Sequence, residues 1–236
     1  MPRYRISYTK EGTARFISHL DMIRLFERAA RRAGLPVSLS RGFNPHPRLA
    51  FSLPLPVGMG GLQEYLDMEL DTGAPPAWIV RSLNSAMPPG LGITGACRLD
   101  EKSPALMAEV ERSLYIVRAA REEMPELEAL RKCLAGIMAL AAIPVARSKK
   151  DGPPALFDIR PGLLSLRAVE EGDRVAVEME LMTGSRFNVR PGEVITAIRE
   201  RCGIFGGDAH VEITRTRMLG RGGKEMFDYC AGEVEG

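Results

Sequence analysis

Residues 3–34 of the chain read RYRISYTKEGTARFISHLDMIRLFERAARRAG, and this stretch predicts a strand followed by a helix. Tyr4, Ile6 and Tyr8 alternate with polar residues, a period of two that is typical of a half-buried strand. Ser18 begins the helix with an acidic residue three positions on, and Gly34 ends it. Within the helix, apolar residues share one face and arginines the other, so we expect it to pack on a sheet with its arginines in solvent.

The rest of the first half continues this pattern. Short strands are predicted at residues 35–40, 48–53, 64–70 and 91–99, and a helix at residues 75–87, where two prolines mark the start. The order is β-α-β-β-(β)-α-β, the ferredoxin-like split βαβ plan with an added hairpin strand.

The second half repeats that order. A strand at residues 112–120 precedes an apolar-striped helix at 124–141, and a hairpin spans 162–181. A helix at 190–203 and a strand at 210–219 follow. The sequence therefore predicts an α+β protein of two tandem ferredoxin-like halves with extra hairpin strands. The expected domains are residues 1–102 and 103–219, followed by a flexible Gly-rich tail at 220–236.

Composition favours a globular cytoplasmic protein. The 236 residues are 45% hydrophobic and 26% charged, which argues against wholesale disorder. No apolar leader follows Met1, and the longest weakly polar run, CLAGIMALAAIPVA, is too short to span a bilayer. The cysteines at positions 97, 133, 202 and 230 contain no C-x-x-C pair, so we expect reduced thiols and no metal or iron–sulfur site in this chain.

Positive charge is concentrated at the N-terminus. Residues 1–50 carry ten Lys or Arg against three acids, although the whole chain has a net charge of only +2. Nine of the ten are Arg, whose planar guanidinium matches phosphate oxygens. A polyanionic partner such as RNA is one interpretation, and a solvated surface balanced by acids elsewhere in the fold is the other.

The stretch GFNPHPRLAFSLPLPVG, residues 42–58, is a candidate recognition element. Pro45 and Pro47 keep Asn44 and His46 out of the helical region, so the turn is extended and stiff. Stiffness lowers the entropy lost when a side chain is held for a ligand. A rigid corner between strands would explain the prolines equally well, but not Asn44, His46 and Arg48 at alternate positions.

His19 is a second candidate, because it lies just inside a helix N-terminus that can attract anions. A buried histidine packed on the sheet is the alternative. Asp21 is two residues away and cannot share its helix face, which argues against a local His–Asp pair.

In the second half, a polar set could continue a phosphate track, and a solvated loop explains its lysines equally well. The set comprises Arg147, Lys149, Lys150, Arg160, Arg186, Asn188 and Arg190. No phosphate-loop, dinucleotide, serine-hydrolase or zinc-protease motif occurs.

The combination ARFISHLD, FERAARRAGLPVSLSRGFNPHPRLAFSLPLPVG and EYLDMEL is long and specific. It resembles the radical SAM-linked family, a bacterial domain of unknown function that is free-standing or fused to radical SAM proteins with a cobalamin-binding-type domain. The resemblance implies a radical SAM protein as partner. This chain lacks the C-x-x-x-C-x-x-C loop, so an iron–sulfur cluster and SAM would belong to that partner.

Three functional hypotheses follow. The first is an RNA-binding accessory module for radical SAM modification or processing of tRNA or rRNA, not catalytic by itself. Its contact residues would be Arg15, Arg24, Arg28, Arg31, Arg32, Arg41, Asn44, His46 and Arg48. The second is a metal-independent endoribonuclease with His19 or His46 as general base, an analogy to CRISPR repeat-processing enzymes of similar inferred topology. The third is a protein–protein adaptor for the radical SAM partner.

Overall fold

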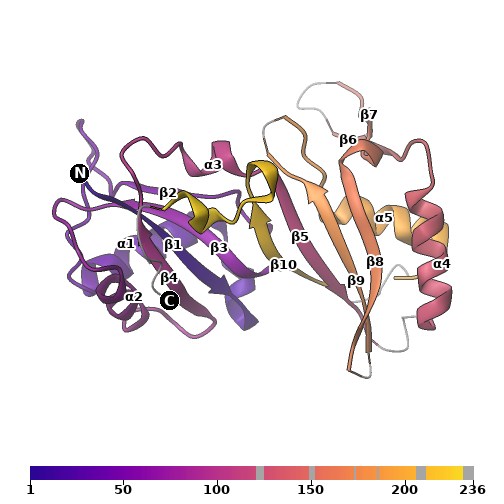
Figure 1. Ribbon diagram of the computed structural model, residues 1–236, viewed down its shortest axis with the longest axis horizontal. Helices are drawn as coiled ribbons and strands as arrows, with labels where there is room; N and C mark the ends of the chain where they lie inside the picture. The colour runs from indigo at the N-terminus through magenta and orange to yellow at the C-terminus, as the bar shows by residue number, and fades with distance from the viewer. Residues whose placement is uncertain (121–124, 149–151, 173, 185, 206–210, 231–236) are drawn as a thin grey trace. The chain divides into compact units, whose positions relative to one another are not determined.

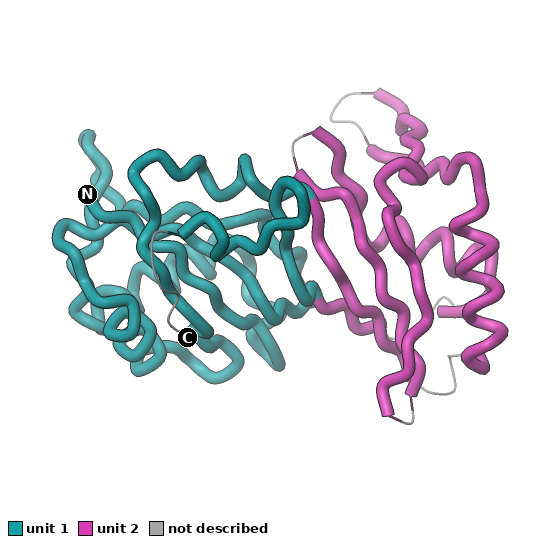
Figure 2. Tube along the Cα trace, in the orientation of Figure 1, with its two compact units in different colours: residues 1–111, 215–236 teal, residues 112–214 magenta. Residues whose placement is uncertain are grey.

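The computed structural model in Figure 1 describes residues 1–120, 125–148, 152–172, 174–184, 186–205 and 211–230. The chain forms two compact units, the first of residues 1–111 and 215–236 and the second of residues 112–214 (Figure 2). Both combine a sheet with helices, so the predicted α+β class is confirmed. The units differ from the expected halves, because the C-terminal segment returns to the first unit instead of forming a separate tail.

The first unit is built around strand β1 (Arg3–Lys10). This strand lies between β3 (Gly60–Glu69) and β4 (Leu91–Arg98) and is antiparallel to both. Short β2 (Leu49–Phe51) also pairs with β3 in antiparallel register, and β10 (Glu212–Leu219) neighbours β3 as well. The strand predicted at 35–40 is reduced to two isolated bridges, Val37 with Leu70 and Leu39 with Pro47.

Helices α1 (His19–Arg32) and α2 (Pro76–Asn84) pack on one face of this sheet. Alternation along β1 places Tyr4, Ile6 and Tyr8 on that face, where they form one core with Phe26 of α1 and Leu83 of α2. The predicted helix start is confirmed, because the Ser18 hydroxyl accepts the Asp21 amide at 3.2 Å.

The opposite face of the sheet is also covered. Short α3 (Leu106–Glu109) and the 3₁₀ turn η5 (Met226–Tyr229) bury Leu106 and Met226 in a cluster on this face, and a further 3₁₀ turn, η4 (Arg221–Gly223), precedes η5. Met226 is fully buried against Tyr65 of β3. The segment after Gly220, expected to fray, is therefore packed as far as Cys230, which also bridges to Leu99.

In the second unit, β9 (Arg174–Met182) lies between β5 (Arg112–Arg118) and β8 (Leu163–Glu171) and is antiparallel to both. Two helices with buried apolar faces belong to this unit, α4 (Leu127–Met138) and α5 (Pro191–Cys202). A separate hairpin of β6 (Pro144–Arg147) and β7 (Ala155–Asp158) precedes the 3₁₀ turn η3 (Arg160–Gly162).

The cysteines contradict the expectation of free thiols. Cys97 of β4 is bonded to Cys230, and Cys133 of α4 is bonded to Cys202 of α5. The Cα atoms of the two pairs are 5.9 and 6.0 Å apart, within the range that a disulfide spans. Partners 133 and 69 residues apart meet only through the tertiary fold, so no local spacing pattern predicts that they pair.

Asp158 gives the second unit a predicted acid sensitivity. Its Oδ1 accepts the amides of Ile143 at 2.7 Å and Arg160 at 3.0 Å, and these bonds hold the pKa of the carboxyl below its usual range. The stabilisation is complete above the unfolded pKa of about 4 and is lost as the pH falls through the lowered folded pKa. Asp158→Asn keeps an accepting oxygen, so we expect a smaller loss of stability below about pH 4 than in the wild type. Urea unfolding of the full chain between neutral and acid pH measures this, with exposed Glu170→Gln as the control that should follow the wild type.

Candidate nucleic-acid interface

The outer face of α1 carries the predicted arginines. Four of them are exposed, while the apolar residues of the same helix are buried: Arg24, Arg28, Arg31 and Arg32 outside, Met22, Phe26, Ala29 and Ala30 inside. Arg24 lies 3.5 Å from Asp21, and Arg32 donates to the Ala86 carbonyl. In the part of the chain that the structure describes, no carboxylate pairs with Arg28 or Arg31. This face therefore presents positive charge to solvent.

The proline turn, residues 40–48, has a pinned backbone. The Ser40 amide donates to the His46 carbonyl at 2.8 Å, and the His46 amide donates to the Ser40 hydroxyl at 3.1 Å. The Ser40 hydroxyl also lies 2.9 Å from His46 Nδ1. At its base, the Arg48 amide donates to the Ser38 carbonyl at 2.8 Å. His46 therefore braces the proline turn instead of standing free for chemistry at both ring nitrogens.

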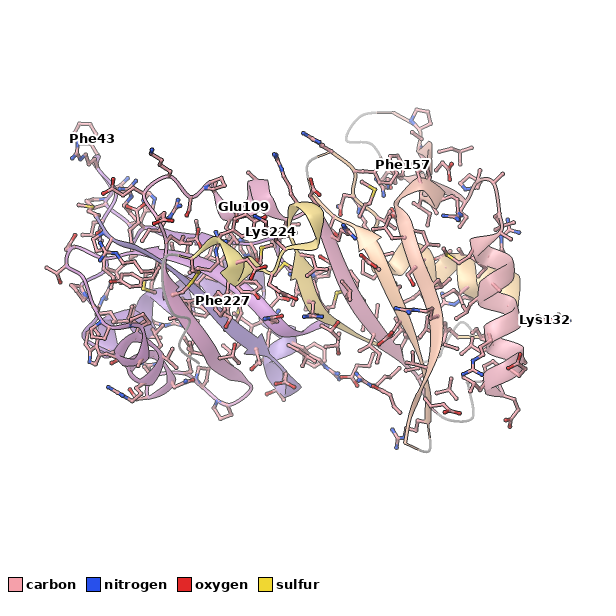
Figure 3. The ribbon with its side chains drawn as sticks, in the orientation of Figure 1. Phe43, Glu109, Lys132, Phe157, Lys224 and Phe227 are labelled. Carbon is pink, nitrogen blue, oxygen red and sulfur yellow. A yellow bond between two sulfur atoms is a disulfide. The ribbon has the colours of Figure 1, made fainter. Side chains whose placement is uncertain are left out.

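The side chains of the proline turn stand in solvent from Arg41 to His46. Phe43 is completely exposed, with a relative accessibility of 106%, and Figure 3 shows its ring projecting from the edge of the molecule. Burying such a ring is worth roughly 1.5–3 kcal/mol, so an aromatic ring held out of any core is available to a partner. Sequence reasoning missed Phe43, although its position between Gly42 and Asn44, outside any periodic apolar pattern, was a usable signal.

The structure separates the two candidate histidines. The His19 ring packs edge-on against Phe51 at 5.6 Å, and Phe51 lies opposite Leu66 of β3. The Arg48 carbonyl, at the base of the proline turn, accepts a hydrogen bond from the Glu69 amide. Glu69 is three residues after Leu66 on β3, which corresponds to about 10 Å along the strand. His46 lies beyond that point. The two rings therefore have different surroundings, His19 against the core residue Phe51 and His46 within the exposed proline turn.

Two predicted contact residues have local partners. Arg48 forms a 2.7 Å ion pair with Glu69, although its side chain is about half exposed. Arg15 is half-buried, and its guanidinium lies over the Phe16 ring at 5.0 Å from the centroid. The proline turn and the outer face of α1, without Arg15 and His19, make up the most exposed part of the predicted interface.

Residues 3–191 match the family described as uncharacterized protein conserved in bacteria (DUF2344). The chain belongs to this family. No curated protein matches it. Two solved structures are similar, an unknown protein from Galdieria sulphuraria at 14% identity and one named "putative glycine cleavage system transcriptional repressor" at 10% identity. Each match covers 91% of this chain and 98% of the other, with TM-scores of 0.25 and 0.22, too low to carry any argument.

The family match includes all seven second-unit residues proposed to extend a phosphate track, but two of them have structural partners. Arg147 pairs with Glu193 at 2.7 Å and lies 3.7 Å from the centroid of the Phe157 ring. Arg160 donates to the carbonyls of Met138, Leu140 and Leu163. Exposed members are Arg186, Asn188 and Arg190, whereas Lys149 and Lys150 lie outside the described residues.

The structure has no helix, among the residues it describes, that is long and apolar enough to cross a membrane. Within the same residues, no three His, Cys, Asp or Glu side chains gather closely enough to hold a metal ion. His210 falls outside the described part of the chain.

Proposed function

We propose that this chain is an RNA-binding accessory module that works with a radical SAM enzyme in the modification or processing of tRNA or rRNA. It would act in the cytoplasm and would not be catalytic by itself, and the iron–sulfur cluster and SAM would belong to the partner. One observation carries the proposal: a pinned turn holds a fully exposed Phe43 beside Arg41, Asn44 and His46.

These residue types fit unpaired RNA better than a duplex. Aromatic rings stack on splayed bases, and amide and imidazole groups can bond to base edges. Arginines on α1 would contact phosphates, since Arg28 and Arg31 are exposed and lack carboxylate partners among the described residues. Double-stranded RNA is recognised mostly through its shape and through contacts to 2′-hydroxyls and phosphates, which a phenylalanine ring does not make.

A finer description of the fold belongs to the same proposal. In the first unit, β1, α1, β2, β3, α2 and β4 follow in the order of a split βαβ motif, with β3 between β1 and β2. In the second, β9 lies between β5 and β8. Both patterns support two ferredoxin-like units with an extra hairpin in the second.

The test is titration of the purified full chain with total tRNA and with single-stranded rRNA fragments at rising salt. We expect binding at low salt that weakens steeply, and Phe43→Ala should lower the affinity by about 5- to 150-fold, the worth of one stacked base. Phe16→Ala is the matched control, because Phe16 is 57% exposed on the same unit but outside the proline turn.

Absence of RNA binding at low salt would contradict the RNA proposal. Equal losses of RNA affinity in Phe43→Ala and Phe16→Ala would show that Phe43 is not a specific RNA contact. If no RNA binds and a radical SAM partner still co-purifies after nuclease treatment, the chain is a protein–protein adaptor.

A further inference from the structure

Residues 220–230, here called the C-terminal strap, are fixed to the first unit at three points. The strap continues from Leu219 of β10 at one end, and Cys230 at its other end is bonded to Cys97 of β4. Between these ends, Met226 is fully buried in a cluster of apolar side chains. The disulfide therefore holds the far end of a segment whose near end is continuous with the sheet.

The contacts between the ends of the strap are local ones. Met226 packs against Tyr65, and its carbonyl accepts a bond from Arg5 Nη1 at 3.0 Å. The Tyr229 carbonyl accepts a bond from the Ser103 hydroxyl at 3.2 Å. These contacts can break without separating the strands of the sheet beneath, so the strap can open locally while the unit stays folded.

A disulfide at this place has a special meaning in the cytoplasm, and this step rests on the location given under the proposed function. Cytoplasmic thiols are kept reduced, so a disulfide found there is usually catalytic or redox-sensing. Thiol oxidoreductases use a C-x-x-C pair, and the sequence contains none. Redox sensing is therefore the role that fits Cys97 and Cys230.

The two sulfurs of this bond differ in access. Cys97 is fully buried and Cys230 is half-buried, so the thiolate of a reductant reaches the Cys230 sulfur first. Cys97 then leaves as a thiolate and takes up a proton. A second thiol of the reductant displaces Cys230, and the products are two protein thiols and the disulfide form of the reductant. Burial of Met226 returns the two cysteines to a Cα separation of 5.9 Å, which allows glutathione disulfide to close the bond again.

We propose that the bond between Cys97 and Cys230 makes the C-terminal strap redox-sensitive. Reduction by a cytoplasmic thiol releases the strap, and oxidation fixes it again. The open form exposes the apolar side chains that now pack with Met226, among them Tyr65 and Leu106. The strap contains neither the proline turn nor the outer arginines of α1, so its opening does not depend on RNA binding.

The size of the effect follows from the loop that the bond closes. While the bond is intact, an open strap is restricted to a loop between Leu219 and Cys230. A crosslink across a loop of this length removes enough entropy from the open form to change its population by about 100-fold. Reduction should therefore raise the open population of the strap by about that factor.

The test is hydrogen exchange of the full chain, followed by mass spectrometry, in buffers of reduced and of oxidised glutathione. Alkylation of free thiols shows which cysteine pairs are reduced. The amides of Asp228 and Cys230 bond to carbonyls of the strap at 3.0 Å, so they report its opening. We expect strap peptides to exchange about 100-fold faster in the reduced buffer, while peptides of β1 keep their rate.

Two variants separate this bond from disulfides in general. Cys230→Ser leaves Cys97 in the core, and its strap should exchange fast in both buffers. Cys133→Ala with Cys202→Ala is the matched control, because it removes the disulfide between α4 and α5 of the second unit. Its strap should respond to the two buffers as the wild type does.

The proposal is overturned if the strap exchanges at the same rate in both buffers, or if alkylation finds Cys97 and Cys230 still bonded in reduced glutathione. It is also overturned if the control variant opens the strap as much as Cys230→Ser. Should Cys230→Ser fail to fold, the wild-type comparison still decides. RNA binding is measured separately by the titration with tRNA, so a failure there leaves the result for the strap unchanged.

Discussion

Replacing Arg5 by Met should lower the free energy of unfolding by about 3–5 kcal/mol, the usual loss when one partner of a buried ion pair is removed. Arg5 is fully buried on the face of the first-unit sheet opposite α1 and α2. Its Nε and Nη2 donate to the two oxygens of Asp67 at 2.9 and 3.1 Å. Its Nη1 donates to Glu109 at 2.8 Å and to the Met226 carbonyl at 3.0 Å.

The loss is large because Met would leave two carboxylates without their cation. Asp67 and Glu109 are 4% and 3% exposed, so water cannot replace the guanidinium. Burial already raises the pKa of Glu109, and Arg5 is the main group that opposes this rise. Figure 3 shows Glu109 close to the C-terminal segment that supplies Met226, so the same change should also loosen that segment.

Urea unfolding at neutral pH measures the Arg5 effect. Arg48→Met is the matched control, because its ion pair with Glu69 is about half exposed and should contribute only about 0–1 kcal/mol. Adding Asp67→Asn and Glu109→Gln to Arg5→Met should recover part of the lost stability by removing the stranded charges. Equal effects of Arg5→Met and Arg48→Met would show that the Arg5 cluster is not a closed, buried network.

Strand alternation predicted which residues of β1 and β3 share a face, but it did not predict that the polar face would be buried. Local period alone places Arg5 and Asp67 on the side away from α1, where a half-buried strand would meet solvent. The residues that bond to Arg5 on this face include Glu109 and Met226, which lie 104 and 221 residues from Arg5 in the sequence. No local pattern encodes contacts at such separation, and the Gly-rich composition after Gly220 argued for fraying.

The candidate site divides in the same way. Helical period correctly placed Arg24, Arg28 and Arg31 in solvent, because that assignment needs only the spacing of residues on one helix. The burial of Lys10 could not be predicted, since Lys10 is the last residue of a strand, nor could the ion pair of Glu64 with Arg215, which are 151 residues apart. Position in sequence distinguishes neither an exposed lysine from a buried one nor a paired carboxylate from a free one.

Changing Arg24, Arg28 and Arg31 together to Gln should lower RNA affinity by about 10³-fold at low salt, if each arginine neutralises one phosphate. The three lie on one stripe of α1, four and three residues apart, so a single RNA backbone could contact all of them. Gln is a good helix former, and all three side chains are exposed, so the helix should remain intact. The slope of log affinity against log salt should fall by about 2–3.

A control triple separates this surface from net charge. Arg167, Arg174 and Arg201 are exposed on the second unit, and changing them to Gln removes the same charge. That control should keep the wild-type salt slope, because the slope counts phosphates contacted and not the charge of the whole protein. A control that loses as much affinity and slope as the α1 triple would mean diffuse attraction without an interface on α1. An unchanged slope in the α1 triple would place the phosphates elsewhere, whatever Phe43 contributes.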